Sequence, residues 1–178
     1  DYTCWHVISY NNDGTVESKQ TFQGKNDDSS WARGQAWAIY GYTACFRETN
    51  DSIFLNFAKD IANMIMDRVK TEDAIPYWDY DAPVTKETPR DVSAASVTAS
   101  AMIELSTMVP DGQKYLDYAE KILKSLSSDA YLAKVGDNQG FILMHSVGSL
   151  PNGSEIDTPL NYADYYYLEA LKRFMELK

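Results

Sequence analysis

A helical repeat restricts the folds open to this chain more than any other feature of its sequence. Apolar and small side chains recur, at a constant offset of 61 residues, in two segments with the spacing of amphipathic helices. The matching positions are Phe54, Leu55, Phe57, Ala58 and Ile61 in the first segment and Tyr115, Leu116, Tyr118, Ala119 and Ile122 in the second. The segments before them repeat in the same way, with Ser30 and Asp91 as candidate N-caps. The repeat therefore predicts a chain built from successive pairs of helices.

The two helices of each predicted pair differ in composition. The first is rich in small residues, as in 94–101, whereas the second has a one-sided apolar stripe, as in 115–123. Small residues on all sides suit an inner helix that is packed on both flanks, and a single stripe suits an outer helix that faces water. The expected helices cover roughly residues 30–48, 52–69, 91–108, 112–127 and 160–176.

Paired inner and outer helices imply an all-α solenoid or a closed α/α toroid. The offset of 61 residues is much longer than the roughly 34 residues of a tetratricopeptide unit, and long loops fit a toroid whose mouth carries a site. Segments 5–10 and 15–19, joined by an Asp-Gly turn, predict a short N-terminal β-hairpin. Residues 130–159 interrupt the repeat with Gly and Pro, and 141–147 within them is strand-like. We expect a single domain over 1–178.

Composition excludes several classes of function. The net charge is −10, whereas a nucleic-acid-binding protein usually carries an excess of basic residues. No apolar run approaches the ~20 residues of a membrane span. The two histidines form no His/Cys cluster, so no metal site is predicted. The sequence also lacks a phosphate-binding loop, a dinucleotide fingerprint and a G-x-S-x-G elbow. We therefore expect no nucleic acid, no membrane and no metal.

The segment from Asp27 to Trp37 concentrates groups that suit an acidic sugar. A helix beginning near its serines would place Trp31 and Arg33 in the first turns, where the helix dipole favours an anion. The guanidinium fork can grip a carboxylate, and indole rings can cover the apolar face of a sugar. The same residues also fit two core tryptophans and a surface arginine, with Arg33 stacked on Trp37. A face of Gly34, Ala38 and Gly41 is expected to let a neighbouring helix approach closely.

Sugar chemistry usually requires carboxylates in different environments. The candidates are Asp27, Asp28, Asp79, Asp81, Asp91 and Asp157. Each also fits a helix cap, a turn or a solvated loop, and the residues alone do not select among them.

The run 27–37 resembles the signature of the unsaturated glucuronyl hydrolases, glycoside hydrolase family 88. The likeness continues in order through 76–83, 90–95, 141–148 and 162–171, and so spans nearly the whole chain. The resemblance implies an (α/α)6 barrel with a short N-terminal β-hairpin, of which this chain would form roughly the C-terminal half. Two and a half helical hairpins cannot close a ring of six. The start at Asp1, without an initiator methionine or signal segment, is likewise expected of a piece of a larger protein.

Members of this family hydrate the C4–C5 double bond of a terminal unsaturated uronyl residue in oligosaccharides that polysaccharide lyases produce. The resemblance places the acid/base aspartate upstream of this chain, which predicts an inactive fragment, and implies no cofactor. The predicted substrate-binding residues are His6, Gln23, Trp31, Arg33, Trp37 and His145. His6 also fits a structural strand histidine, and His145 fits a mid-strand packing residue. Many relatives have Thr-His-Gln-Gly where this chain has Thr21-Phe22-Gln23-Gly24. Because Phe22 replaces the histidine and cannot donate a hydrogen bond, the polar contacts that the histidine makes in relatives are in doubt here.

The sequence also fits two alternatives: an unsaturated rhamnogalacturonyl hydrolase, and a non-catalytic α/α-repeat module that binds a protein or a glycan. The expected partner is an unsaturated uronyl oligosaccharide. A half ring would leave apolar edges of inner helices uncovered, so association through those edges is also expected. The family likeness favours a bacterial polysaccharide-degradation system and the periplasm over the cytoplasm.

Overall fold

The computed structural model describes residues 1–177 as helices with two small hairpins. The helices are α1 (Ala32–Thr49), α2 (Ser52–Arg68), α3 (Val92–Ser106), α4 (Gln113–Leu126) and α5 (Asn161–Glu176). The strands are β1 (Val7–Tyr10), β2 (Val16–Gln20), β3 (Ser146–Ser149) and β4 (Ser154–Thr158), and a short 3-10 turn, η1, covers Asn138–Gly140. Every predicted helix is confirmed to within two residues at each end.

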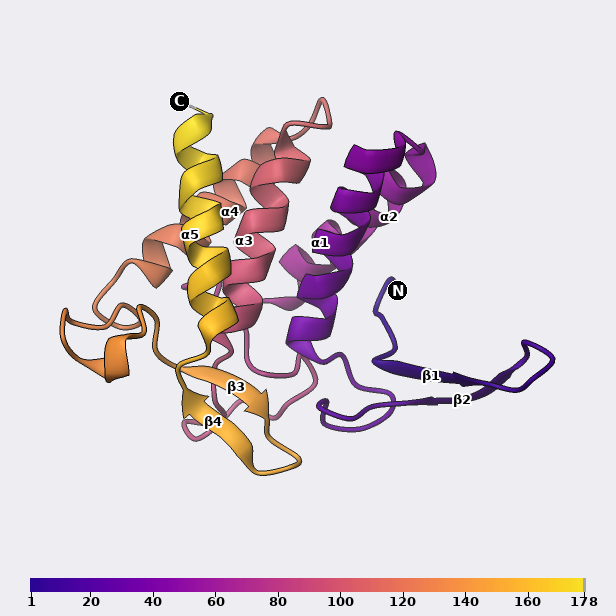
Figure 1. The fold of residues 1–178 in the computed structure, drawn as a ribbon, viewed down its shortest axis with the longest axis horizontal. Coiled ribbons are helices and arrows are strands. Elements are labelled where there is room, and N and C mark those ends of the chain that lie inside the picture. Colours follow the sequence, from indigo (N-terminus) through magenta and orange to yellow (C-terminus); the bar gives the residue numbers. More distant parts are fainter. Residues whose placement is uncertain (178) are drawn as a thin grey trace.

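The helices form an inner and an outer layer. Figure 1 shows α1, α3 and α5 side by side, and all three begin at the end of the molecule that carries the strands. Helix α2 packs against α1, and α4 packs against α3. The predicted inner helices are therefore inside and nearly parallel, with α3 at the centre. The fold is part of an (α/α)6 barrel, as expected.

Composition explains this layering. Every residue of α3 is buried except Glu104 and Ser106, because its small side chains let neighbours approach on all sides. Helix α4 instead buries a single stripe spaced as one helical face, formed by Tyr115, Ala119, Ile122, Leu123 and Leu126. One continuous core joins side chains from every helix.

The N-terminal caps were predicted only in part. The carboxylate of Asp91 accepts from the N–H of Ser93 at 3.1 Å, which confirms the cap of α3. The expectation that Ser30 caps α1 is wrong, because Trp31 occupies the cap position and no side chain bonds there. The N–H of Ser30 donates instead to Asp81 at 2.9 Å.

The face of α1 that approaches α3 also differs from the prediction. Ala32 and Ala36 are fully buried and pack with Ala94 and Val97 of α3. Gly41, which was expected on the approaching face, has nothing within 4 Å of an added Cβ. The close approach therefore uses alanines on the opposite side of the helix from the predicted glycine face.

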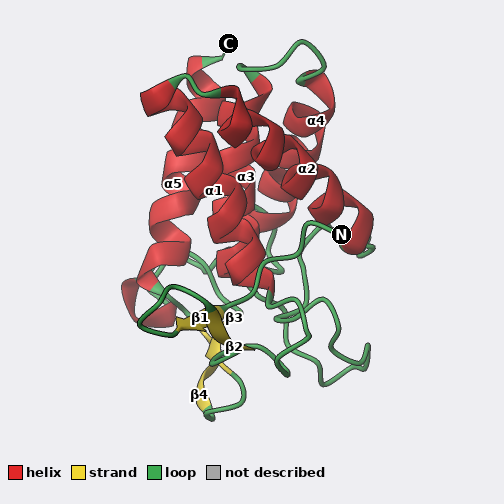
Figure 2. Ribbon diagram, turned by 90° about the vertical axis from the view of Figure 1, so that its right-hand side faces the viewer, coloured by secondary structure: helices red, strands yellow, loops and turns green. Residues whose placement is uncertain are grey.

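Both hairpins and the long loops gather at one end of the helix layers (Figure 2). The first hairpin pairs β1 with β2 in antiparallel register and confirms the N-terminal prediction. The second pairs β3 with β4. The strand expected over 141–147 begins only at Ser146, because His145 adopts a left-handed backbone with φ of 66°. This end therefore presents loops and hairpins over the first turns of the inner helices.

Helix α5 leaves apolar side chains uncovered along its outward face. Tyr165, Leu168 and Met175 are 59%, 52% and 73% exposed. This is the type of edge through which association was predicted from the sequence.

Substitution of Gly112 and of Gly41 by alanine is expected to change the free energy of unfolding in opposite directions. A Cβ at Gly112 would lie 1.9 Å from the carbonyl oxygen of Ser106, whereas one at Gly41, on the exposed face of α1, would meet nothing. Gly112→Ala should lower the free energy of unfolding by about 1–3 kcal/mol because the backbone must shift. Gly41→Ala should raise it by about 0.5–1 kcal/mol, since alanine favours the helix. Chemical denaturation of both variants checks the packing; equal effects would contradict it.

Candidate active site

An aromatic cavity of about 330 Å³ lies between the N-terminal segment and the first turns of α1. Its walls bring together His6, Gln23, Trp31 and Trp37, which were predicted to bind substrate. The remaining lining residues are Cys4, Trp5, Gly34 and Gln35. The lining contains no Asp or Glu, so none of the candidate catalytic aspartates of this chain lies in the wall of this cavity.

His6 is fixed as a neutral hydrogen-bond donor. Its Nδ1 accepts from the backbone N–H groups of Phe22 at 3.1 Å and Gln23 at 3.3 Å. A nitrogen that accepts carries no proton, so the neutral ring holds its hydrogen on Nε2. Burial, and then the positive charge of Arg33, lower the pKa of His6. The ring also stacks on Trp31, with centroids 4.4 Å apart.

Gln23 is held by the second hairpin. Its Nε2 donates to the carbonyl oxygen of Gly148 at 2.7 Å, across 125 residues of sequence. The turn that carries it is tight, because a Cβ at Gly24 would come within 2.6 Å of the Thr21 hydroxyl. The amide group therefore has a fixed position in the cavity wall, and its oxygen can accept a hydrogen bond.

The tryptophans and Gln35 join the cavity to the helices. Trp31 is 6% exposed, whereas Trp37 is half-buried and meets the Tyr166 ring of α5 edge to face at 5.2 Å. Gln35 accepts from the N–H of Cys4 at 2.9 Å and donates to its carbonyl at 3.3 Å. This fully buried amide was not predicted as a site residue, although an amide inside a helix rich in small residues was a signal for it. It clamps the segment that carries His6 onto α1.

Arg33 does not line the cavity, and its guanidinium group bonds to other parts of the protein. It is 2% exposed, pairs with Asp91 at 2.7 Å, and donates to the carbonyl oxygens of Val147 at 2.5 Å and Gly148 at 2.7 Å. Its guanidinium lies 4.5 Å from the centre of the Trp31 ring, so the cation–π contact predicted with Trp37 forms with Trp31 instead. A direct grip on a substrate carboxylate, as expected from the sequence, would require these internal contacts to open.

His145 is not brought into the aromatic cavity. It lines a separate depression of about 370 Å³, where its Nδ1 lies 2.6 Å from the carboxylate of Asp157. Because it precedes β3 and its side chain is 41% exposed, the mid-strand packing interpretation is wrong. Its predicted role as a rim contact for substrate stays a prediction.

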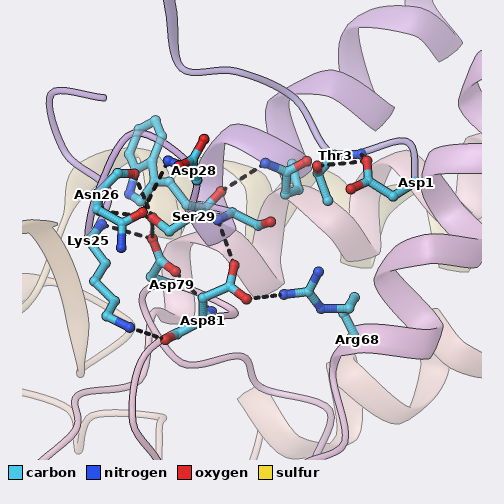
Figure 3. A network of polar contacts seen from close by, with 12 residues as sticks. Asp1, Thr3, Lys25, Asn26, Asp28, Ser29, Arg68, Asp79 and Asp81 are labelled. Carbon is cyan, nitrogen blue, oxygen red and sulfur yellow. Dashed lines mark hydrogen bonds and ion pairs between the residues drawn. The ribbon is translucent and has the colours of Figure 1, made fainter. Parts of the chain in front are cut away.

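Several candidate aspartates instead brace the loops around the cavity (Figure 3). Asp79 is 1% exposed and accepts from the N–H of Lys25 at 2.9 Å and the hydroxyl of Ser29 at 2.7 Å. Asp27 accepts from the N–H of Thr21 at 2.8 Å. Asp79 thus braces the loop between Gln23 and Trp31, in line with the turn-forming role considered from the sequence. Asp27, considered from the sequence as a helix cap, bonds the backbone before this loop instead.

Among residues 1–177, no cluster of three or more His, Cys, Asp or Glu side chains could hold a metal ion. No helix in this described part combines the length and apolar character needed to cross a membrane.

Paired inner and outer helices with an aromatic cavity at their loop end define the chain as part of an α/α barrel. No family model matches it. It is 46% identical to an unsaturated glucuronyl hydrolase of Formosa agariphila, over 99% of this chain and 44% of that protein. The chain belongs to the unsaturated glucuronyl hydrolases, and it spans about half the length of the relatives that it matches.

Solved structures agree with this assignment. An unsaturated glucuronyl hydrolase specific for heparin has a TM-score of 0.97 and 57% identity, over 99% of this chain and 48% of that one. A variant of the Streptococcus agalactiae enzyme, complexed with dGlcA-GalNAc6S, has a TM-score of 0.85 and 32% identity, over 98% of this chain and 47% of that one. The similarity therefore extends along this whole chain.

The lowered pKa of His6 predicts a pH dependence of stability. The unfolded chain binds a proton at the ordinary pKa of about 6.5, and the folded chain binds it only at lower pH. Unfolding therefore takes up a proton in the interval between, and the free energy of unfolding should fall as the pH drops from about 7 to 5. His6→Gln should flatten this fall, whereas His145→Gln should retain it. Denaturation at several pH values checks this, and an unchanged slope in His6→Gln would contradict it.

Proposed function

We propose that the protein containing this chain hydrates the C4–C5 double bond of a terminal unsaturated uronyl residue and so releases the rest of the oligosaccharide. The observation that carries the proposal is the aromatic cavity, in which His6, Gln23, Trp31 and Trp37 converge in a chain related to unsaturated glucuronyl hydrolases along its whole length. The aspartates that supply acid and base lie outside residues 1–178 in this proposal, so this chain alone is inactive.

The cavity suits one wall of such a site. Trp37 offers a half-exposed ring for the apolar face of the sugar, and Nε2 of His6 offers a donor for one of its oxygens. Gln23, fixed on Gly148, can hold the attacking water or a sugar hydroxyl. Addition of water across a polarised enol ether needs an acid, a base and a positioned water, so the proposal includes no cofactor.

The substrate class follows from the relatives. One similar structure is specific for heparin, and another contains a sulfated disaccharide, so we propose glycosaminoglycan or related polyuronide fragments. Phe22 bears on the choice among them. Its side chain is 66% exposed and its carbonyl accepts from Asn152 at 3.2 Å, so an apolar ring stands beside Gln23 where many relatives have histidine. Substrates that depend on that histidine should be handled less well.

The unsaturated disaccharide assay tests this proposal. In the full-length gene product, the conjugated double bond should lose its ultraviolet absorbance on hydration, whereas residues 1–178 alone should give no turnover. Gln23→Ala should lower kcat/KM by roughly 10- to 100-fold, because a hydrogen bond of about 1–3 kcal/mol is lost. Gln113→Ala is the matched control and should change kcat/KM by less than about threefold, since Gln113 is an exposed glutamine at the start of α4 and does not line the cavity.

Thermal melting of each variant separates loss of function from loss of fold. A fully active Gln23→Ala enzyme would assign the chemistry to other residues. A full-length product that binds but never hydrates the disaccharide would favour the non-catalytic module, and preference for unsaturated rhamnogalacturonyl fragments would favour the pectin-directed alternative.

A further inference from the structure

A second hollow follows the loop between α2 and α3, apart from the aromatic cavity. Three depressions of about 320, 550 and 370 Å³ adjoin one another there. Arg90 lines all three, Tyr77 and Val84 line the first two, and Lys86 lines the last two. Because neighbouring depressions share walls, they form one trough, and none of its lining residues lines the aromatic cavity. We call it the basic trough and define it by Arg68, Lys70, Tyr77, Tyr80, Lys86 and Arg90.

The charge of the basic trough differs from that of the whole chain. Its lining includes the cations Arg68, Lys70, Lys86 and Arg90, but only two acidic side chains, Glu87 and Asp157. The chain as a whole carries a net charge of −10. Lys70 and Lys86 are exposed and, within the described residues, form no hydrogen bond or ion pair. The trough therefore offers two uncompensated cations in an otherwise acidic protein.

Arg68 is held in place at one end of the trough. Its guanidinium pairs with Asp81 at 2.7 Å and lies 5.8 Å from the centre of the Tyr80 ring. The other oxygen of Asp81 accepts from Ser30, the residue before Trp31, and Figure 3 shows Arg68 reaching Asp81 beside the braced loop. The Arg68 side chain remains 33% exposed, so a ligand can reach it without rearrangement.

The middle of the trough is equally well fixed. Arg90 lies over the Tyr77 ring at 4.5 Å and pairs with Asp73 at 3.3 Å, yet 27% of its side chain is exposed. The adjoining loop is closed by the hydroxyls of Thr85 and Thr88, which lie 3.0 Å apart. Each arginine of the trough is thus held against a tyrosine ring and a carboxylate, and is positioned before any ligand binds.

We propose that the basic trough binds a stretch of anionic glycan, a sugar chain with carboxylate or sulfate groups, outside the aromatic cavity. The guanidinium and ammonium groups pair with the anionic groups, and the tyrosines cover apolar sugar faces. The proposal rests on the proposed function only for the class of ligand. Such a site would hold the glycan without taking part in hydration.

The test uses a heparin octasaccharide without a double bond as the probe, with affinity to residues 1–178 measured at several salt concentrations. Lys70→Ser/Lys86→Ser should weaken binding about fivefold or more, and should reduce the dependence of affinity on salt, because two screened ionic contacts are lost. Lys121→Ser/Lys124→Ser removes two exposed lysines of α4 and serves as the matched control, with a change below about twofold. Melting curves of both variants exclude unfolding.

The proposal would be overturned by a lack of octasaccharide binding at low salt or by equal effects of the two double substitutions. Competition by a DNA strand of equal charge that is as strong as competition by the glycan would overturn it too. Binding that is lost in Trp37→Ala but kept in Lys70→Ser/Lys86→Ser would place the glycan in the aromatic cavity, which also rejects the trough. Hydration of the unsaturated disaccharide by the full-length product is measured separately and should be unchanged in Lys70→Ser/Lys86→Ser. Failure of the trough is thus distinguishable from failure of the proposed function.

Discussion

The buried ion pair between Arg33 and Asp91 is the contact on which the loop end of this fold depends. Both side chains are almost completely excluded from water, with 3% and 0% exposure, so each charge needs the other. Arg33 belongs to α1 and Asp91 caps α3, while two further acceptors of the guanidinium, Val147 and Gly148, belong to β3. A single side chain thus joins two inner helices and the second hairpin.

The Arg33–Asp91 pair also positions the residues that line the aromatic cavity. The carbonyl oxygen of Gly148 accepts both from Arg33 and from Gln23, so the position of Gln23 depends on the arginine. The guanidinium also lies against the Trp31 ring, on which His6 stacks. Gln35 completes the assembly because it bonds both backbone groups of Cys4. The site is therefore positioned by buried polar groups, which are costly to leave unpaired and so specify one arrangement.

The helices could be predicted because their signals are local. The small residues of α3 and the single stripe of α4 each imply a degree of burial, and the Asp91 cap satisfies an amide two residues away. The grouping of His6, Gln23, Trp31 and Trp37 came from the family likeness. What the sequence could not reveal depends on distant partners. Ser30 bonds to Asp81, 51 residues away, and Arg33 bonds to Gly148, 115 residues away. The spacing of residue types along the sequence does not indicate such distant pairs.

A double-mutant cycle on the Arg33–Asp91 pair, read as the free energy of unfolding of residues 1–178, measures how strongly the loop end depends on this contact. Arg33→Met should destabilise the fold by about 3–5 kcal/mol, because it leaves the Asp91 carboxylate buried without its cation. Asp91→Asn keeps a capping side chain, and the double variant should lose clearly less than the two single losses together. Additive losses, or an Arg33→Met protein as stable as the original, would contradict the account.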